Sequence, residues 1–169
     1  MHLIIDGYNL LHVGRSTINM SPNELQQERN RLIEQLSSYQ RTRPFDITVV
    51  FDGWQGGWNT EKQERRKGIE LIFSKLGEKA DDVIKRLVKE KGAGAIIITS
   101  DRDISRYAEK MTATVIPSDK FKKRIEVSAI GIEKGIEPDE EIERGLKRKG
   151  PSKRPSKRER RAKAALKKL

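Results

Sequence analysis

Single aspartates follow three short apolar runs of this sequence. They are Asp6, Asp52 and Asp101, and the runs span residues 2–5, 47–51 and 95–99. Such runs are typical of buried parallel strands, whose carboxyl ends meet at one edge of a sheet. Carboxylates gathered there repel one another unless a hard divalent cation neutralises them. The pattern therefore indicates a Mg²⁺ or Mn²⁺ site that can activate water and stabilise a phosphodiester during its cleavage.

An adjacent pair of acids, Asp81 and Asp82, opens a predicted amphipathic helix over residues 80–91. At about 100° per residue, Asp81 borders the apolar face of this helix, and Asp82 shares its side with basic residues. We therefore expect Asp81 to face the sheet edge and Asp82 to face solvent. Both acids would also suit the helix dipole without a metal, and Asp103 would suit a helix cap that begins at Ser100.

Residues near these acids each have two possible roles. Asn9, three residues after Asp6, can orient a ligating carboxylate or a phosphate oxygen, or it can bond its own backbone as a turn residue. Tyr8 can stack on a base, but packing is the simpler role. Taken alone, Asp52-Gly53 is most often a turn, yet separate turns give no reason for all the acids to share one edge. We therefore interpret the acids as one cluster, and the absence of cysteine argues against zinc.

Strands and helices alternate along the first 130 residues. Further strands are predicted at 69–73 and 113–116, and helices at 80–91, 104–111, 118–127 and from Ser21-Pro22, where Ser21 and Glu24 suit a capping box. Because the strands are continuous apolar runs, we predict an α/β fold with a mostly parallel sheet covered by helices on both faces. Residues 54–67 are polar and predict a mobile loop, whose Trp54 and Trp58 either stack on unpaired bases or anchor the loop.

Positive charge is concentrated at the end of the chain. Of the 36 Lys and Arg residues, 13 lie from Arg144 onward beside one acid, which leaves 23 bases and 24 acids elsewhere. Such a block is typical of a tail that binds nucleic acid or an acidic membrane. We divide the chain into a domain at 1–130, a helical or irregular extension at 131–149 and a basic, flexible tail at 150–169 that can become a helix when bound. Without cysteines, a secretory segment or a membrane-length apolar run, we expect a cytoplasmic protein.

Four acid-containing segments occur in a distinctive order and spacing. They are Asp6–Leu10, Phe51–Gly53, Lys79–Ile84 and Thr99–Asp101. Together they resemble the NYN domain, and most of all the YacP-like bacterial group within the PIN-like nucleases; residues 80–103 also resemble the acidic core of the 5′-nucleases that process flapped DNA. The resemblance covers residues 1–130. It implies a PIN-like three-layer α/β/α fold, a Mg²⁺ or Mn²⁺ cofactor and endoribonuclease activity, with RNA on the ribosome as a candidate substrate.

The resemblance also implies roles for individual residues. Metal binding carries over to Asp6, Asp81 and Asp101, with Asn9 and Asp52 in support. All five are candidate catalytic residues. Asp82 and Asp103 are further candidate metal ligands. Asp82 occupies a position where the flap nucleases carry a second acid.

Two basic clusters inside the domain can hold an RNA backbone, or they can be ordinary solvated surface. They are Lys62, Arg65, Arg66 and Lys67, and Lys120, Lys122, Lys123 and Arg124. The competing function is a non-catalytic RNA- or ribosome-binding protein, in which the tail binds and the acids are a structural remnant. A phosphatase or receiver domain fits less well, because Tyr8 stands where a nucleophilic phosphatase carries its second aspartate and no phosphate-cradling glycine loop is present.

Overall fold

The computed structural model describes residues 1–14, 20–41, 43, 45–53, 58–134 and 156–169. Its strands are β1 (His2–Asp6), β2 (Asp46–Phe51), β3 (Lys62–Arg66), β4 (Ile69–Phe73), β5 (Ala95–Ile98) and β6 (Thr114–Ile116). Its helices are α1 (Gly7–His12), α2 (Pro22–Gln40), α3 (Ala80–Lys91), the short 3₁₀ turn η2 (Gly92–Gly94), α4 (Arg102–Lys110), α5 (Ser118–Lys134) and α7 (Lys157–Lys168).

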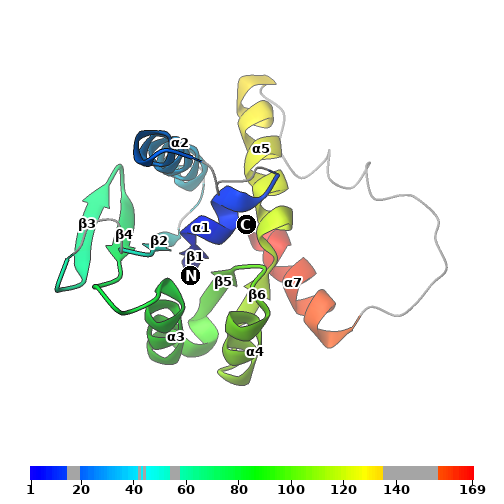
Figure 1. Ribbon diagram of the computed structural model, residues 1–169. Helices are drawn as coiled ribbons and strands as arrows, with labels where there is room; N and C mark the ends of the chain where they lie inside the picture. The colour runs from blue at the N-terminus through cyan, green and yellow to red at the C-terminus, as the bar shows by residue number, and fades with distance from the viewer. Residues whose placement is uncertain (15–19, 42, 44, 54–57, 135–155) are drawn as a thin grey trace.

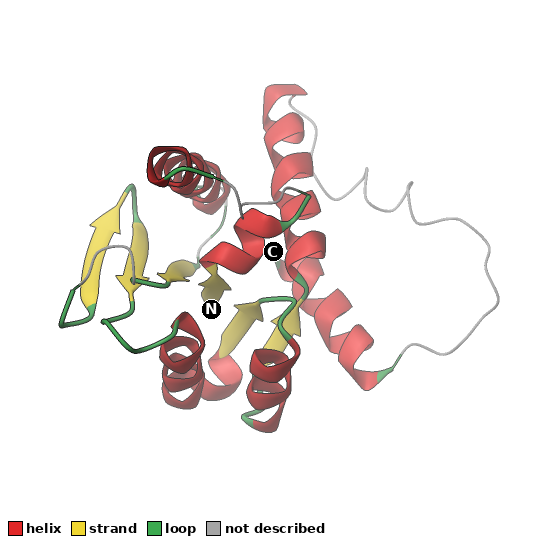
Figure 2. Cartoon of the chain, in the orientation of Figure 1, coloured by secondary structure: helices red, strands yellow, loops and turns green. Residues whose placement is uncertain are grey.

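The described strands form one sheet in the order β3-β4-β2-β1-β5-β6 (Figure 2). Successive residues of each strand face opposite sides, so Leu3 and Ile5 pack in one core and Ile4 packs in the other. Helices α1, α2, α5 and α7 lie on the first side, and α3 and α4 lie on the second (Figure 1). The predicted α/β fold, with a mostly parallel sheet between helical layers, is confirmed.

The loop predicted over residues 54–67 is wrong for its second half, which forms strand β3. This strand pairs antiparallel with β4 at the edge of the sheet. All five of its residues are polar, because an edge strand exposed on both sides needs no apolar alternation, and its charges discourage pairing with another chain. Residues 54–57, which include Trp54, lie outside the described part. Trp58 packs against the ring of Phe73 at 5.5 Å between centroids, as expected of a loop anchor.

Two helix termini near the start of the chain are set by side-chain caps. Helix α2 begins as predicted, because Ser21 and Glu24 form a complete capping box and Pro22 takes the first helical position. Helix α1 was not predicted. It spans 6 residues and begins directly after β1, where the Asp6 side chain accepts a hydrogen bond from the Asn9 N–H. None of the helices in the described ranges has the length and apolar content needed to cross a bilayer.

The flexible tail predicted from residue 150 is wrong for its last part, which forms helix α7 and packs against β6. Ala162, Ala165 and Leu169 are buried, and the Tyr39 hydroxyl donates to the Leu169 carbonyl oxygen at 2.5 Å. The buried face is made mostly of alanines, so the surrounding bases conceal it in the sequence. The predicted extension at 131–149 lies largely outside the described residues, apart from the end of α5 at Lys134.

Candidate acidic site

The predicted acids meet at the carboxyl edge of the sheet. Asp6 ends β1, Asp52 follows β2, and Asp101 lies shortly after β5, and these three strands are adjacent and parallel. Asp81 is the second residue of α3, which starts at the same edge and runs back along the sheet. The geometry therefore brings four of the predicted carboxylates together, as parallel strands require.

Asp6 lies at the centre of this cluster and is 8% exposed. Its Oδ1 accepts a hydrogen bond from the Asn9 backbone N–H at 3.1 Å, and its Oδ2 accepts one from the Thr99 hydroxyl at 3.1 Å. The pKa of Asp6 is raised to about 6, mainly by burial; the two hydrogen bonds lower it, and the charges of Asp81 and Asp101 raise it. Asp6 therefore takes up a proton at a higher pH than an ordinary aspartate does, chiefly because it is buried.

Asp81 and Asp82 face different surroundings, as the helical geometry predicted. Burial raises the pKa of Asp81, and the next largest cause is the charge of Asp101. Asp82 is exposed, and its carboxylate accepts a hydrogen bond from the Lys79 backbone N–H at the start of α3. Asp81 therefore belongs to the cluster, and Asp82 mainly caps its own helix.

Asp101 holds the start of α4 with one of its two oxygens. Its Oδ1 accepts hydrogen bonds from the backbone N–H groups of Asp103 at 2.7 Å and Ile104 at 2.9 Å. Its Oδ2 has no hydrogen-bond partner among the described residues, so that atom is available to a ligand. Asp103 points away: it is exposed and pairs with Lys85, with 2.5 Å between Oδ2 and Nζ.

Two neutral side chains join the elements that carry the acids. The Asn9 Oδ1 accepts hydrogen bonds from the Ser100 backbone N–H at 2.9 Å and from the Ser118 hydroxyl at 2.8 Å. The Thr99 hydroxyl, which donates to Asp6, also accepts a bond from the Asp101 backbone N–H at 3.1 Å. Asn9 is therefore more than a turn residue, and Thr99 is a positioning residue that sequence reasoning missed. The one available signal was a polar residue ending a run of isoleucines.

Close packing explains both Asp-Gly pairs. A Cβ on Gly7 would lie 2.3 Å from the Phe51 ring, and a Cβ on Gly53 would lie 1.9 Å from the Ser74 carbonyl oxygen. Neither glycine has a positive φ, so close packing and not backbone conformation excludes a side chain at these positions.

The Asp52 Oδ1 accepts a hydrogen bond from the Ala80 backbone N–H at 2.6 Å, which fixes the start of α3 and so the position of Asp81.

The donor set at this edge consists of carboxylate oxygens, which suit Mg²⁺ or Mn²⁺ better than zinc. Within the described ranges, no three His, Asp or Glu side chains are close enough together to enclose a cation. Mg²⁺ commonly keeps several waters and takes one or two carboxylates from the protein. The cluster fits a cation held in that way, with water completing its coordination.

The first predicted basic cluster is divided between opposite edges of the sheet. Lys62 pairs in register with Phe73 at the carboxyl end of β4, whereas Arg66 pairs with Ile69 at its amino end. Lys62 therefore lies at the carboxyl edge of the sheet, the same edge as the acids. Its Nζ is 4.8 Å from the centre of the Trp58 ring. The bases placed toward the opposite edge are Arg65, Arg66 and Lys67.

The second predicted basic cluster lies in the first turns of α5, which begins beside Asn9. Lys122 donates to the Val13 carbonyl oxygen at 2.7 Å, and Arg124 is 5% exposed. Both side chains are thus committed to the interior of the fold. Lys120 and Lys123 remain exposed and are the members of this cluster that can meet an anion.

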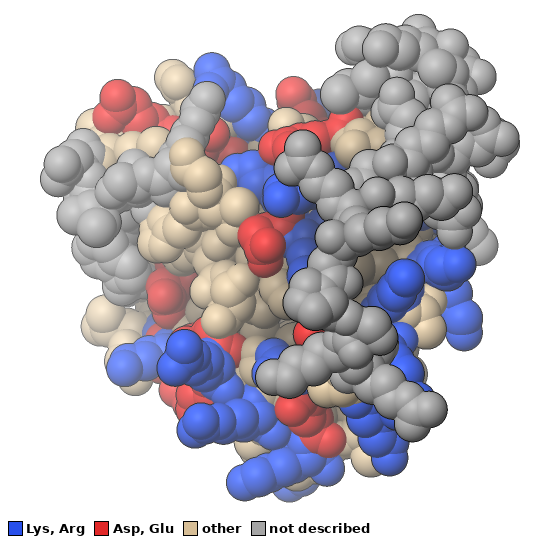
Figure 3. Space-filling model, turned by 90° about the vertical axis from the view of Figure 1, so that its right-hand side faces the viewer, with Lys and Arg blue, Asp and Glu red and all other residues tan. Residues whose placement is uncertain are grey.

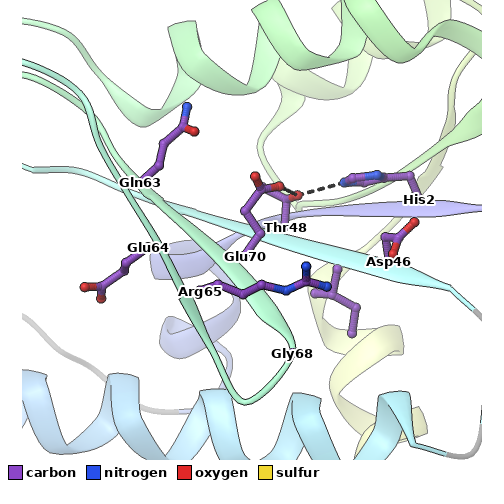
Figure 4. A pocket seen from close by; sticks show the side chains of 9 residues that line it. His2, Asp46, Thr48, Gln63, Glu64, Arg65, Gly68 and Glu70 are labelled. Atoms are coloured by element: carbon purple, nitrogen blue, oxygen red, sulfur yellow. Dashed lines mark hydrogen bonds between the residues drawn. The ribbon is translucent and has the colours of Figure 1, made fainter.

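A cavity of about 350 Å³ lies at the opposite, amino edge of the sheet. Figure 4 shows its lining, in which the His2 Nε2 and Thr48 Oγ1 atoms are 2.7 Å apart and the Thr48 hydroxyl donates to Glu70 at 2.5 Å. These polar groups satisfy one another across three adjacent strands. Because the cavity is separated from the acids by the length of the strands, we do not assign it to the same site.

The chain matches the family of YacP-like NYN domains over residues 3–168. It is 30% identical over 87 residues to the YacP protein of Bacillus subtilis (strain 168), covering 52% of this chain and 51% of that protein, so the match spans about half of that relative. Two crystal structures of Rae1 (YacP) from Bacillus subtilis have a similar fold, with TM-scores of 0.65 and 0.64 at 21% and 23% identity. These likenesses cover 90% and 86% of this chain, and 87% and 84% of those chains. The family match extends through α7, beyond the residues 1–130 on which the sequence resemblance rested.

Proposed function

Because the chain belongs to the family of YacP-like NYN domains, which share a PIN-like, nuclease-type fold, we propose that it is a cytoplasmic endoribonuclease that requires Mg²⁺ or Mn²⁺. The observation that carries this proposal is the convergence of Asp6, Asp81 and Asp101 on one edge of the sheet. Their mutual repulsion is relieved when a divalent cation binds among them. Hydrolysis of a phosphodiester bond is the chemistry that such a site serves.

Asp6, Asp81 and Asp101 would hold the cation, one or two of them directly and the rest through its bound water. When bound, the cation supplies activation of water and stabilisation of the charge on the phosphate. Asp52 positions Asp81 through the start of α3. Asn9 has its Oδ1 occupied, and its Nδ2 is left to donate to a phosphate oxygen. Asp82 and Asp103 are occupied with helix capping and with Lys85, so we assign them supporting charge at most.

Bases on both sides of the acids would hold the RNA backbone. Lys62 lies on the β4 side of the cluster, and Lys120 and Lys123 lie on the β6 side. Helix α7 adds exposed bases on the side of the molecule seen in Figure 3, where Lys and Arg side chains are most numerous in the lower half. This cationic segment from Arg144, together with the resemblance to the YacP-like group, supports RNA on the ribosome as the substrate.

The alternative is a protein that binds RNA or the ribosome without cutting. The cationic segment from Arg144 supports this second function, because its bases can bind RNA whether or not the acids cut it. A labelled single-stranded RNA incubated with the protein and Mn²⁺ separates the two, because a nuclease shortens the RNA and a binding protein leaves it intact.

Metal binding is expected to raise the melting temperature of the protein. A cation that binds only the folded state stabilises it by about 2.7 kcal/mol at a hundredfold excess over its dissociation constant. For a chain of this size that is a rise of roughly 5–10 °C. The rise should be nearly absent in Asp81→Asn, because Asp81 faces the cluster, and should persist in Asp82→Asn, because Asp82 faces solvent.

Thermal unfolding followed by circular dichroism, in EDTA and in saturating Mn²⁺ or Mg²⁺, measures these shifts. Asp82→Asn is the matched control, since it removes the same charge from the adjacent residue of the same helix. Equal shifts in the two variants would contradict the assignment of Asp81 as a ligand.

A further inference from the structure

Arg29 of α2 reaches from the helical layer to the edge that carries the acids. Its guanidinium carbon lies 5.9 Å from the ring centroids of both Phe51 and Phe73, the last residues of β2 and β4. Its Nη2 donates to the Gln26 side chain at 2.7 Å, and its Nε is buried without a hydrogen-bond partner. No carboxylate in the described ranges forms an ion pair with it. The half-buried guanidinium is thus surrounded by aromatic rings and by neutral polar groups, the Gln26 amide and the Tyr8 hydroxyl.

The Phe51 ring joins Arg29 to the acid cluster. The same ring lies against Gly7, the residue after Asp6, and packs edge-on against Tyr8 with 5.3 Å between centroids. Asp52 follows Phe51 directly. Arg29 and Asp52 both lie close enough to the Tyr8 hydroxyl to act on it electrostatically. Arg29 therefore sits one aromatic ring away from the start of the acid site.

Arg29 lacks the kind of carboxylate partner that Arg31, on the same helix, has in Glu28. A guanidinium removed from water is normally paired with a carboxylate, because an unpaired buried charge is costly. The faces of Phe51 and Phe73 compensate part of that cost for Arg29. Its nearest polar neighbours, the Gln26 side chain and the Tyr8 hydroxyl, are neutral. A guanidinium with no anionic partner is the side chain best suited to a phosphate.

We infer that Arg29 binds a backbone phosphate of the RNA on the β2–β4 side of the scissile bond. The inference rests on the proposed function. Lys62 lies on the same side, on the Trp58 ring that packs against Phe73. Lys120 lies on the β6 side, so bases on both sides of the acids direct single-stranded RNA across the carboxyl edge of the sheet. Sequence reasoning missed Arg29, because it lies within an amphipathic helix far from every acidic motif.

The test is the affinity for a short labelled single-stranded RNA across a salt series, in the Asp101→Asn background to prevent cleavage. Arg29→Gln should weaken binding at least about tenfold, as expected for a charged hydrogen bond, and should reduce the slope of log affinity against log salt by about 0.7, which is one phosphate contact. Arg29→Lys should keep the slope but lose affinity, because an ammonium cannot form the paired contact. Arg31→Gln, on the same helix, is the control, since Arg31 is exposed and paired with Glu28.

The outcomes separate this inference from the proposed function. If Arg29→Gln keeps both the affinity and the slope of the parent, Arg29 only packs, and the inference is wrong while the nuclease remains. If Arg29→Gln does not fold, unchanged affinity in Arg29→Lys would equally overturn it. If the parent background binds no RNA at any salt concentration, the proposed function fails and the inference fails with it.

Discussion

Replacing Asp6 with Asn is expected to stabilise the metal-free protein by up to about 3 kcal/mol at pH 8, while cleavage is lost. The pKa of Asp6 is raised from 3.8 to about 6 in the folded protein. Each unit of such a shift corresponds to about 1.4 kcal/mol. The folded state binds this proton more tightly than the unfolded state does, so the charged form of Asp6 opposes folding. Its removal therefore helps the fold and harms the metal site.

The sign of this effect gives it a distinct pH dependence. Below about pH 4, Asp6 is protonated in both states and the variant should gain nothing. As the pH rises from about 4 to 6, the parent loses stability through this group and the variant does not. Urea unfolding of both proteins in EDTA, at several values between pH 4 and pH 8, measures the difference.

Asp103→Asn is the control for this series, because hydrogen bonding to Lys85 lowers the pKa of Asp103. Its charged form favours folding, so its removal should give no gain at pH 8. A constant difference between parent and Asp6→Asn from pH 4 to pH 8 would show that the pKa of Asp6 is not raised in the folded protein.

Ending the chain after residue 155 is expected to lower the free energy of unfolding by about 2–4 kcal/mol, which is the range for losing one large buried aliphatic side chain. The truncation removes Leu169, which is fully buried beside the layer of α2 and α5. It also removes the carbonyl oxygen that accepts the Tyr39 hydroxyl. The sequence alone predicts a flexible tail at this end of the chain.

Urea unfolding at high salt measures this loss, because salt screens the bases that the truncation also removes. Tyr39→Phe in the full chain isolates the contribution of the hydroxyl. Equal unfolding free energies for the full and shortened chains would show that α7 does not contribute to the folded core.

The acid edge could be predicted because it depends on local rules. A buried run predicts a strand, parallel strands end at one edge, and the acids of Asp6, Asp52 and Asp101 follow those ends. The helical period likewise separated Asp81 from Asp82, since it fixes which of two neighbours faces the sheet. These predictions needed no knowledge of which strands pair.

Other features depend on pairing and packing, which sequence patterns do not reveal. The antiparallel register of β3 carries Arg66 away from the acids, although it is only four residues from Lys62. Arg29 reaches the site through the side chains of two strands that lie far from it in sequence. Helix α7 has an apolar face of small residues, so its charge suggested a flexible tail.

Single-turnover cleavage by matched variants tests whether Asp101 and its neighbours hold the cation that RNA cleavage requires. The measurement compares the parent with Asp101→Asn and Asp103→Asn on one labelled single-stranded RNA, in Mn²⁺ and in EDTA. Asparagine caps helices as well as aspartate does, so α4 should remain intact in Asp101→Asn. We predict that Asp101→Asn loses more than about a hundredfold in rate, since even outer-shell partners of a metal are worth about 10- to 100-fold. Asp103→Asn should stay close to the parent, and EDTA should stop both. Cleavage by Asp101→Asn at the parent's rate would show that Asp101 does not hold the cation, and cleavage that continues in EDTA would show that no divalent metal is required.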